Sequence, residues 1–218
     1  MTTVGLITIG QSPRTDTTPE IRSHLPSSVD IVESGALDGY AGRDEVLAGL
    51  APTADEPVYV TKLRDGTSVT ISKAAVLDLV GDRIDEVQSS VDAIGLLCTG
   101  SFPQYDATVP VFAPSELLHA WVTALGFDAV GVLMPKPEQA GQTDDKWGEF
   151  EIYHEAASPY DADADLAAAA RSLGGRVEVI VMDCIGYTEA MKQEVRTASD
   201  TPVLLGRSVL ARTLAEVV

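Results

Sequence analysis

The sequence is poor in cysteine, in aromatic residues and in positive charge. Only two cysteines, Cys98 and Cys184, occur among 218 residues, and aromatic residues make up 6% of the chain. Two cysteines and three scattered histidines give no ligand spacing of the zinc type, and a structural disulfide is disfavoured in a reducing cytoplasm. We therefore expect no bound metal and two free thiols.

Long hydrophobic runs are also absent. No segment reaches the roughly 18 uninterrupted apolar residues that a membrane-spanning helix needs. The amino terminus, MTTVGLITIGQSPR, lacks the charged segment that opens a secretory signal peptide. These absences predict a soluble cytoplasmic protein with no membrane partner. A hydrophobic content of 45% over 218 residues still allows a substantial core, in one large domain or two small ones.

Basic residues are few, with 15 against 33 acidic ones, which gives a formal charge of −18. Acidic residues are spread along the chain, so they indicate a solvated acidic surface rather than a disordered tail. Such a surface repels nucleic acid, and we expect no nucleic-acid partner. Neither G-x-G-x-x-G after the first strand nor G-x-x-x-x-G-K-[ST] anywhere is present, so a nucleotide cofactor is not expected.

What the chain does have is a regular alternation of apolar runs of strand length with amphipathic stretches of helix length. Near-continuous apolar runs are typical of parallel strands covered on both faces, so the alternation predicts an α/β fold. A helix starting near Thr18, as cap before Pro19 and Glu20, is also predicted. The strands are expected at 4–9, 29–33, 93–98, 109–113, 129–134, 150–156, 177–183 and 202–206, and the other helices at 73–90, 115–125, 138–147, 163–173, 187–198 and 207–217.

Two features subdivide this pattern. Asp65-Gly66 lies between two β-rich runs and predicts an antiparallel hairpin at about 58–71. The stretch VGLITIGQSP from Val4 resembles VGVLMPKPEQ from Val130, and each precedes a later strand next to a cysteine. We therefore predict two similar lobes, each a mainly parallel sheet flanked by helices: residues 1–113 plus 207–218, with the hairpin inserted, and residues 114–206.

The two cysteines occupy the same kind of position, after a buried strand and before a glycine, in IGLLCTGSF and VIVMDCIGY. Ligands collect beyond the carboxyl ends of parallel strands, where backbone N–H groups suit a carboxylate or an enolate. If the lobes face each other, Cys98 and Cys184 could flank one molecule. One thiolate would then remove a proton from carbon while the other thiol protonates the opposite face, without a cofactor.

Four stretches carry a resemblance: LITIGQSPRTD, LLCTGS, VMDCIGYT and PVLLGRSVLAR are similar to the AroM family over essentially the whole chain. The paired cysteines resemble those of the aspartate/glutamate/hydantoin racemase superfamily. The resemblance implies two α/β lobes, a site in the cleft between them, one cysteine from each lobe, and a carboxy-terminal helix that returns to the first lobe. It also places Gln11 and Ser12 in a loop where relatives bind polar groups of the substrate.

The residues around the second cysteine depart from the amino-acid racemases, which often have Thr-His there. This chain has Ile185-Gly186, so hydantoin-type or other substrates are at least as well supported as amino acids. Asp183, one residue earlier, is expected to point away from the face of Cys184. The candidate catalytic residues are Cys98 and Cys184. The candidate substrate-binding residues are Gln11, Ser12, Arg14, Thr99, Gly100, Ser101, Lys136, Gly186 and Tyr187.

The preferred function is thus a cofactor-independent racemase or isomerase acting on a small-molecule carboxylate. Two other readings stay open: a non-catalytic binding or regulatory protein with a racemase-like cleft, and a lyase or hydrolase with one thiol as nucleophile. Purely structural interpretations also stay open at single residues. GQSPR is compatible with an ordinary turn, Lys136 with a solvated lysine, and Tyr187 with simple packing. The sequence is also compatible with assembly into a homo-oligomer.

Overall fold

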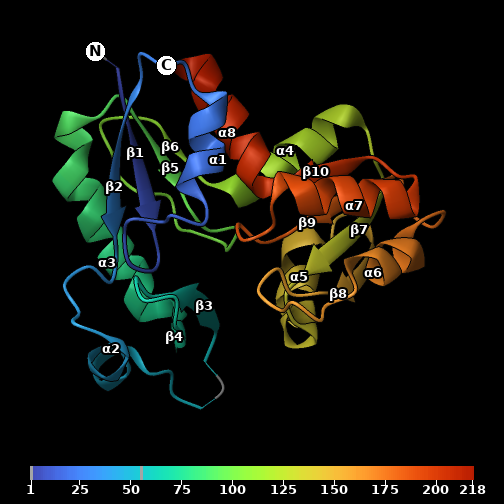
Figure 1. Cartoon of the computed structure of the whole chain (residues 1–218), viewed down its shortest axis with the longest axis horizontal. Helices are drawn as coiled ribbons and strands as arrows, with labels where there is room; N and C mark the ends of the chain where they lie inside the picture. Colours follow the sequence, from blue (N-terminus) through green and yellow to red (C-terminus); the bar gives the residue numbers. More distant parts are fainter. Residues whose placement is uncertain (1, 55) are drawn as a thin grey trace. The chain divides into compact units, whose positions relative to one another are not determined.

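The computed structural model describes residues 2–54 and 56–218, and it divides into two compact units. The first unit is Met1–Ala113 together with Arg212–Val218, and the second is Pro114–Ala211. Each unit has its own sheet and its own buried apolar core. The α/β class expected from the sequence is confirmed (Figure 1).

The first unit is built on a four-stranded parallel sheet of order β2-β1-β5-β6. Helix α3 packs on it through Val76, Val80 and Ile84, which recur every four residues and so share one face. The strands are β1 Thr3–Thr8, β2 Asp30–Gly35, β5 Ala93–Leu96 and β6 Val111–Phe112; the helices are α1 Thr18–His24, α2 Arg43–Leu50, α3 Lys73–Val87 and the 3₁₀ turn η1 Gln88–Ser90.

An antiparallel hairpin interrupts the first unit between α2 and α3. Its strands are β3 Val58–Lys62 and β4 Ser68–Ser72, joined by a turn in which Gly66 has φ 86°. A side chain is disfavoured at this φ, which is why Asp65-Gly66 marked the hairpin correctly. The hairpin lies beyond the carboxyl ends of β1 and β2 (Figure 1), where the Gln11 N–H donates to the Lys62 carbonyl.

The second unit repeats the design with a parallel sheet of order β8-β7-β9-β10. Its strands are β7 Ala129–Met134, β8 Glu151–Ala156, β9 Val179–Met182 and β10 Val203–Leu205. Its helices are α4 Pro114–Leu125, η2 Pro137–Gln139, α5 Ala140–Trp147, α6 Leu166–Leu173 and α7 Glu189–Ser199. Helix α8, Gly206–Val217, begins in this unit, and its residues from Arg212 onward belong to the first unit.

The two sheets share one strand order when strands are counted along each unit: second, first, third, fourth. Val4 lies in β1 and Val130 in β7, the first strand of each sheet, which accounts for the similarity between their sequences. The prediction of two similar lobes with a hairpin in the first is therefore confirmed. The third strands, β5 and β9, both lie beside the first strand of their sheet.

Some boundaries and one helix differ from expectation. Helix α1 has Thr17 rather than Thr18 at its N-cap position, and the Thr17 hydroxyl accepts a hydrogen bond from Arg14 instead of capping the helix. Strands β5 and β9 end two residues before their cysteines. Helix α2, Arg43–Leu50, was not predicted, because it has no side-chain cap and buries only Val46 and Leu50.

Among residues 2–54 and 56–218, no helix is both long enough and apolar enough to cross a membrane.

Candidate functional site

Cys98 lies in a tight turn just beyond β5. The Leu97 N–H donates to the Ile7 carbonyl of β1, which extends the strand pairing up to the residue before the cysteine. The Gly100 N–H then turns back and donates to Cys98 Sγ at 3.3 Å. A backbone N–H aimed at sulfur favours the thiolate over the thiol. Cys98 is in no disulfide and is partly buried.

Cys184 occupies the matching turn in the second unit. The Asp183 N–H donates to the Leu133 carbonyl of β7, and the Gly186 N–H donates to Cys184 Sγ at 3.4 Å. Cys184 is likewise in no disulfide and partly buried. Each unit therefore contains the same device, a Cys-x-Gly turn after the third strand whose glycine donates to the sulfur.

A tyrosine packs on the glycine of each turn. A Cβ added at Gly100 would lie 2.5 Å from the phenol oxygen of Tyr59, and one added at Gly186 would overlap the phenol of Tyr160. Glycine at both positions lets a ring approach the backbone. Neither tyrosine is predicted from the sequence, since neither is near a cysteine in it. The shared Cys-x-Gly spacing was the signal for the close approach.

The two tyrosines use their hydroxyl groups differently. Tyr59, on β3, is buried and donates to the Ser101 carbonyl at 2.7 Å. Tyr160 follows β8, is 39% exposed, and its phenol oxygen lies 4.0 Å from Cys184 Sγ.

The second turn is fixed by charged side chains of its own unit. Asp183 forms an ion pair with Lys146 of α5 at 2.6 Å and accepts a further hydrogen bond from Trp147 Nε1 at 3.3 Å. The Asp183 side chain therefore packs on α5. Arg207 is buried at the start of α8 and donates from two guanidinium nitrogens to the Ile185 carbonyl, at 3.1 and 2.8 Å. These contacts immobilise the residues on both sides of Cys184.

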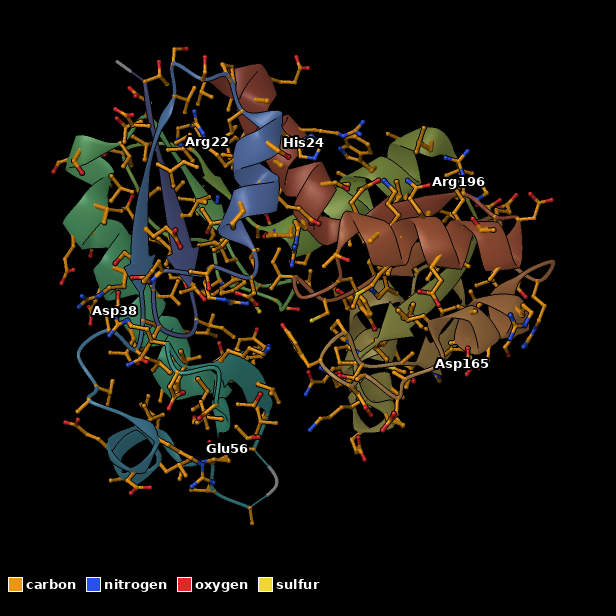
Figure 2. The ribbon with its side chains drawn as sticks, viewed as in Figure 1. Arg22, His24, Asp38, Glu56, Asp165 and Arg196 are labelled. Atoms are coloured by element: carbon orange, nitrogen blue, oxygen red, sulfur yellow. The ribbon has the colours of Figure 1, made fainter. Side chains whose placement is uncertain are left out.

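The loop after β1 contains Gln11 and Ser12, and both residues form hydrogen bonds with other parts of the first unit. Gln11 is buried, donates to the Leu37 and Tyr40 carbonyls, and accepts from the Arg64 N–H. Ser12 donates through its hydroxyl and its backbone N–H to Asp38, which Figure 2 shows beyond the end of β2. These bonds use the donors that the sequence analysis assigned to a substrate.

Arg14 is also committed inside the first unit. It is buried and donates to both carboxylate oxygens of Asp16, at 2.7 and 2.8 Å, and to the hydroxyls of Thr8 and Thr17. Burial alone would raise the pKa of Asp16, but the hydrogen bond and charge of Arg14 outweigh it, so the pKa lies below its usual value. Arg14 therefore closes the loop onto the start of α1.

The remaining predicted residues lie in varied surroundings. Thr99 is buried, whereas Ser101 and Lys136 are exposed, the latter just before η2. Tyr187 is fully buried in the core of the second unit and donates to the Ala157 carbonyl at 2.7 Å. Burial raises its pKa, and nearby Cys184 adds to the effect. The packing interpretation of Tyr187 is thus the one that its contacts support.

Metal chemistry has no evident support in the described part of the chain. No group of three or more histidine, cysteine, aspartate or glutamate side chains gathers there in a way that could hold an ion. The chemistry available at each turn is that of a sulfur with oriented donors.

The model of the family described as AroM protein matches residues 4–218. The chain belongs to the AroM family. A search of curated protein sequences found no match to this AroM-family chain.

The AroM-family chain is similar in fold to solved structures of racemases and of a decarboxylase. Allantoin racemase from Klebsiella pneumoniae has a TM-score of 0.65 at 16% identity, covering 99% of this chain and 87% of its own. Picrophilus torridus aspartate racemase has a TM-score of 0.61 at 13% identity, covering 99% and 94%. Unliganded arylmalonate decarboxylase has a TM-score of 0.61 at 13% identity, covering 100% and 92%.

Proposed function

We propose that this AroM-family protein is a cofactor-independent racemase or isomerase of a small carboxylate, with Cys98 and Cys184 as its acid/base pair. The observation that carries the proposal is the repeated Cys-x-Gly turn: each unit has one partly buried cysteine after its third strand, outside any disulfide, with a glycine N–H that donates to the sulfur. Two bases of similar construction are what a reversible inversion needs, because each must serve as base in one direction and as acid in the other.

The reaction is balanced without a cofactor. One thiolate removes the proton from the carbon next to the carboxylate, and the C–H electron pair passes into an enolate. The opposite thiol then protonates that carbon on its other face and becomes the thiolate. The pair ends with its protonation states exchanged, and no oxidant or reductant is consumed.

The names of the similar structures support carbon-acid chemistry. Two are racemases, of allantoin and of aspartate, and the third is a decarboxylase of arylmalonates. Inversion next to a carbonyl group and loss of carbon dioxide from a malonate both generate a carbanion that must be protonated. We extend this common requirement to the AroM-family chain as a proposal.

The proposed anion contacts come from the turns themselves. Thr99 and Ser101 follow Cys98 in sequence and offer backbone N–H groups and hydroxyls, and Lys136 supplies an exposed cation after β7. Gly100 and Gly186 remain predicted contacts, with N–H groups that also donate to the two sulfurs. Gln11, Ser12 and Arg14 remain predicted ligands, but their internal hydrogen bonds make them better suited to shaping the loop than to binding substrate directly.

The test is a panel of chiral carboxylates and hydantoins in deuterium oxide, including both enantiomers of aspartate, glutamate and allantoin. We expect deuterium to enter at the carbon of at least one substrate while its optical activity decays. Cys98→Ser and Cys184→Ser should each slow inversion by about 10³-fold or more, since general acid–base catalysis contributes roughly 10²–10⁴ per group. Arg196→Gln, at an exposed position of α7, is the matched control and should retain full activity.

Two results would redirect the proposal to the other readings. Tight binding of a panel member, detected as a rise in melting temperature without deuterium exchange, would identify a binding protein. A covalent adduct on one cysteine, detected by mass spectrometry, would identify a thiol nucleophile.

A further inference from the structure

The surroundings of the two thiols differ in one respect that bears on the proposed reaction, namely the phenol beside each turn. The Tyr59 phenol carries one proton and donates it to the Ser101 carbonyl at 2.7 Å, so this proton is committed to the backbone. The Tyr160 phenol lies 4.0 Å from Cys184 Sγ, on the turn whose Gly186 N–H donates to the same sulfur at 3.4 Å.

We propose that Tyr160 is a positioning residue for Cys184: its phenol donates a hydrogen bond to the sulfur and so favours the Cys184 thiolate. The inference rests on the proposed function for its role in turnover, but the hydrogen bond itself is a property of the second unit alone. Tyr160 thereby supplies the second polar group at a position where the sequence has Ile185-Gly186 instead of a histidine.

Three other charged or titratable side chains of the second unit lie near this turn. Asp183 is neutralised by Lys146 at 2.6 Å, which removes most of its repulsion toward a thiolate. Arg207 binds the Ile185 carbonyl and brings a buried positive charge one residue from Cys184. Tyr187 directs its proton to the Ala157 carbonyl. Tyr160 is the tyrosine of this turn whose phenol oxygen lies 4.0 Å from Cys184 Sγ.

The local packing also explains how Tyr160 is held. A Cβ at Gly186 would overlap its phenol, so the ring lies directly on the glycine backbone. The ring keeps the Gly186 N–H on the sulfur, and the missing side chain keeps the phenol within reach of Cys184. Both donors therefore depend on the same glycine.

The experiment measures alkylation of Cys184 by iodoacetamide between pH 5 and 10 in a Cys98→Ser background, because only the thiolate reacts at an appreciable rate. Tyr160→Phe should move the midpoint of the rate profile to higher pH and lower the rate at pH 7 by about three- to tenfold, as expected for loss of a long, partly exposed bond to a charged group. Tyr153→Phe is the matched control, since its phenol donates to Glu151 on β8. It should leave the profile unchanged.

An unchanged profile for Tyr160→Phe, or a midpoint that moves to lower pH, would overturn the proposal; the latter would mean that the thiol donates to the phenol. Gly186→Ala is a second variant that displaces the phenol without removing it, and it should move the midpoint in the same direction as Tyr160→Phe. Circular dichroism confirms that each variant is folded.

The specificity of the contact has its own test. In a Cys184→Ser background, Tyr160→Phe should leave the alkylation profile of Cys98 unchanged. An equal shift at Cys98 would contradict a contact that is specific to Cys184. None of these measurements needs turnover, so they stand or fall separately from the search for a substrate.

Discussion

The phenol of Tyr59 donates a hydrogen bond to the backbone carbonyl of Ser101 at 2.7 Å. This bond ties the hairpin β3–β4 to the turn that carries Cys98, and the ring of Tyr59 covers Gly100 at the centre of that turn. The hairpin is the main element that the first unit has and the second lacks. We infer that the insertion supports the first thiol from within the first unit, while a loop residue, Tyr160, packs on the second turn.

A side chain at the two turn glycines should have unequal effects on stability. Gly100→Ala forces a Cβ against Tyr59, which is buried and hydrogen-bonded, so relief requires movement of the hairpin. Gly186→Ala meets Tyr160, whose ring is 39% exposed and can swing away. We expect Gly100→Ala to cost about 2–3 kcal/mol of unfolding free energy and Gly186→Ala about 1 kcal/mol or less. Denaturant unfolding of the two variants measures both, and equal costs would contradict this packing.

The ion pair between Lys146 and Asp183 should be the most sensitive polar contact of the second unit. Their side chains are only 13% and 9% exposed, so Lys146→Met leaves a buried carboxylate without its cation. We expect a loss of about 3 kcal/mol in unfolding free energy, and the double variant Lys146→Met/Asp183→Leu should recover part of it. Lys136→Met, at an exposed lysine of the same unit, is the control. A double variant less stable than Lys146→Met would show that the pair is not coupled as described.

The sequence was sufficient for the fold because its strands are short, buried and bounded by turn residues. The run AVGVLM predicted β7 to the residue, and Asp65-Gly66 predicted the hairpin, since in both cases a local pattern decides the local structure. The stretches at Val4 and Val130 are similar because each forms the first strand of a sheet, and the two sheets have the same strand order. Helix α2 was not predicted because it is short and weakly amphipathic.

The site was predictable only as far as its residues are neighbours in sequence. Cys98 with Gly100, and Cys184 with Gly186, form turns that two short stretches specify. The residues that contact these turns are distant from the cysteines in sequence, and no local periodicity indicates them: Tyr59, Tyr160 and Arg207. Tyr187 is the converse case: it is next to the turn in sequence, but its side chain enters the core of the second unit.

The Arg14–Asp16 pair should make stability depend on pH in the acid range. The pKa of Asp16 is lower in the folded protein than its ordinary value of 3.8, the effect of Arg14 exceeding that of burial. A lowered folded pKa stabilises the protein fully above the unfolded pKa, and the contribution is lost as pH falls through the folded pKa. The difference in unfolding free energy between the wild type and Asp16→Asn should therefore be largest near pH 7 and shrink below about pH 4. Urea unfolding at pH 7 and pH 3 measures it, and a constant difference would contradict the assignment.

In the proposed reaction, Cys98 and Cys184 act as two separate bases on one carbon. The most direct measurement is the isotopic pattern in the first turnovers of a single enantiomer in deuterium oxide, followed by mass spectrometry of both enantiomers. Inversion by two thiols predicts solvent deuterium in the inverted product and little in the recovered substrate, because the proton removed by one thiol is not the one that the other delivers. Equal early labelling of both enantiomers, or the same exchange rate in the double variant Cys98→Ser/Cys184→Ser, would contradict it.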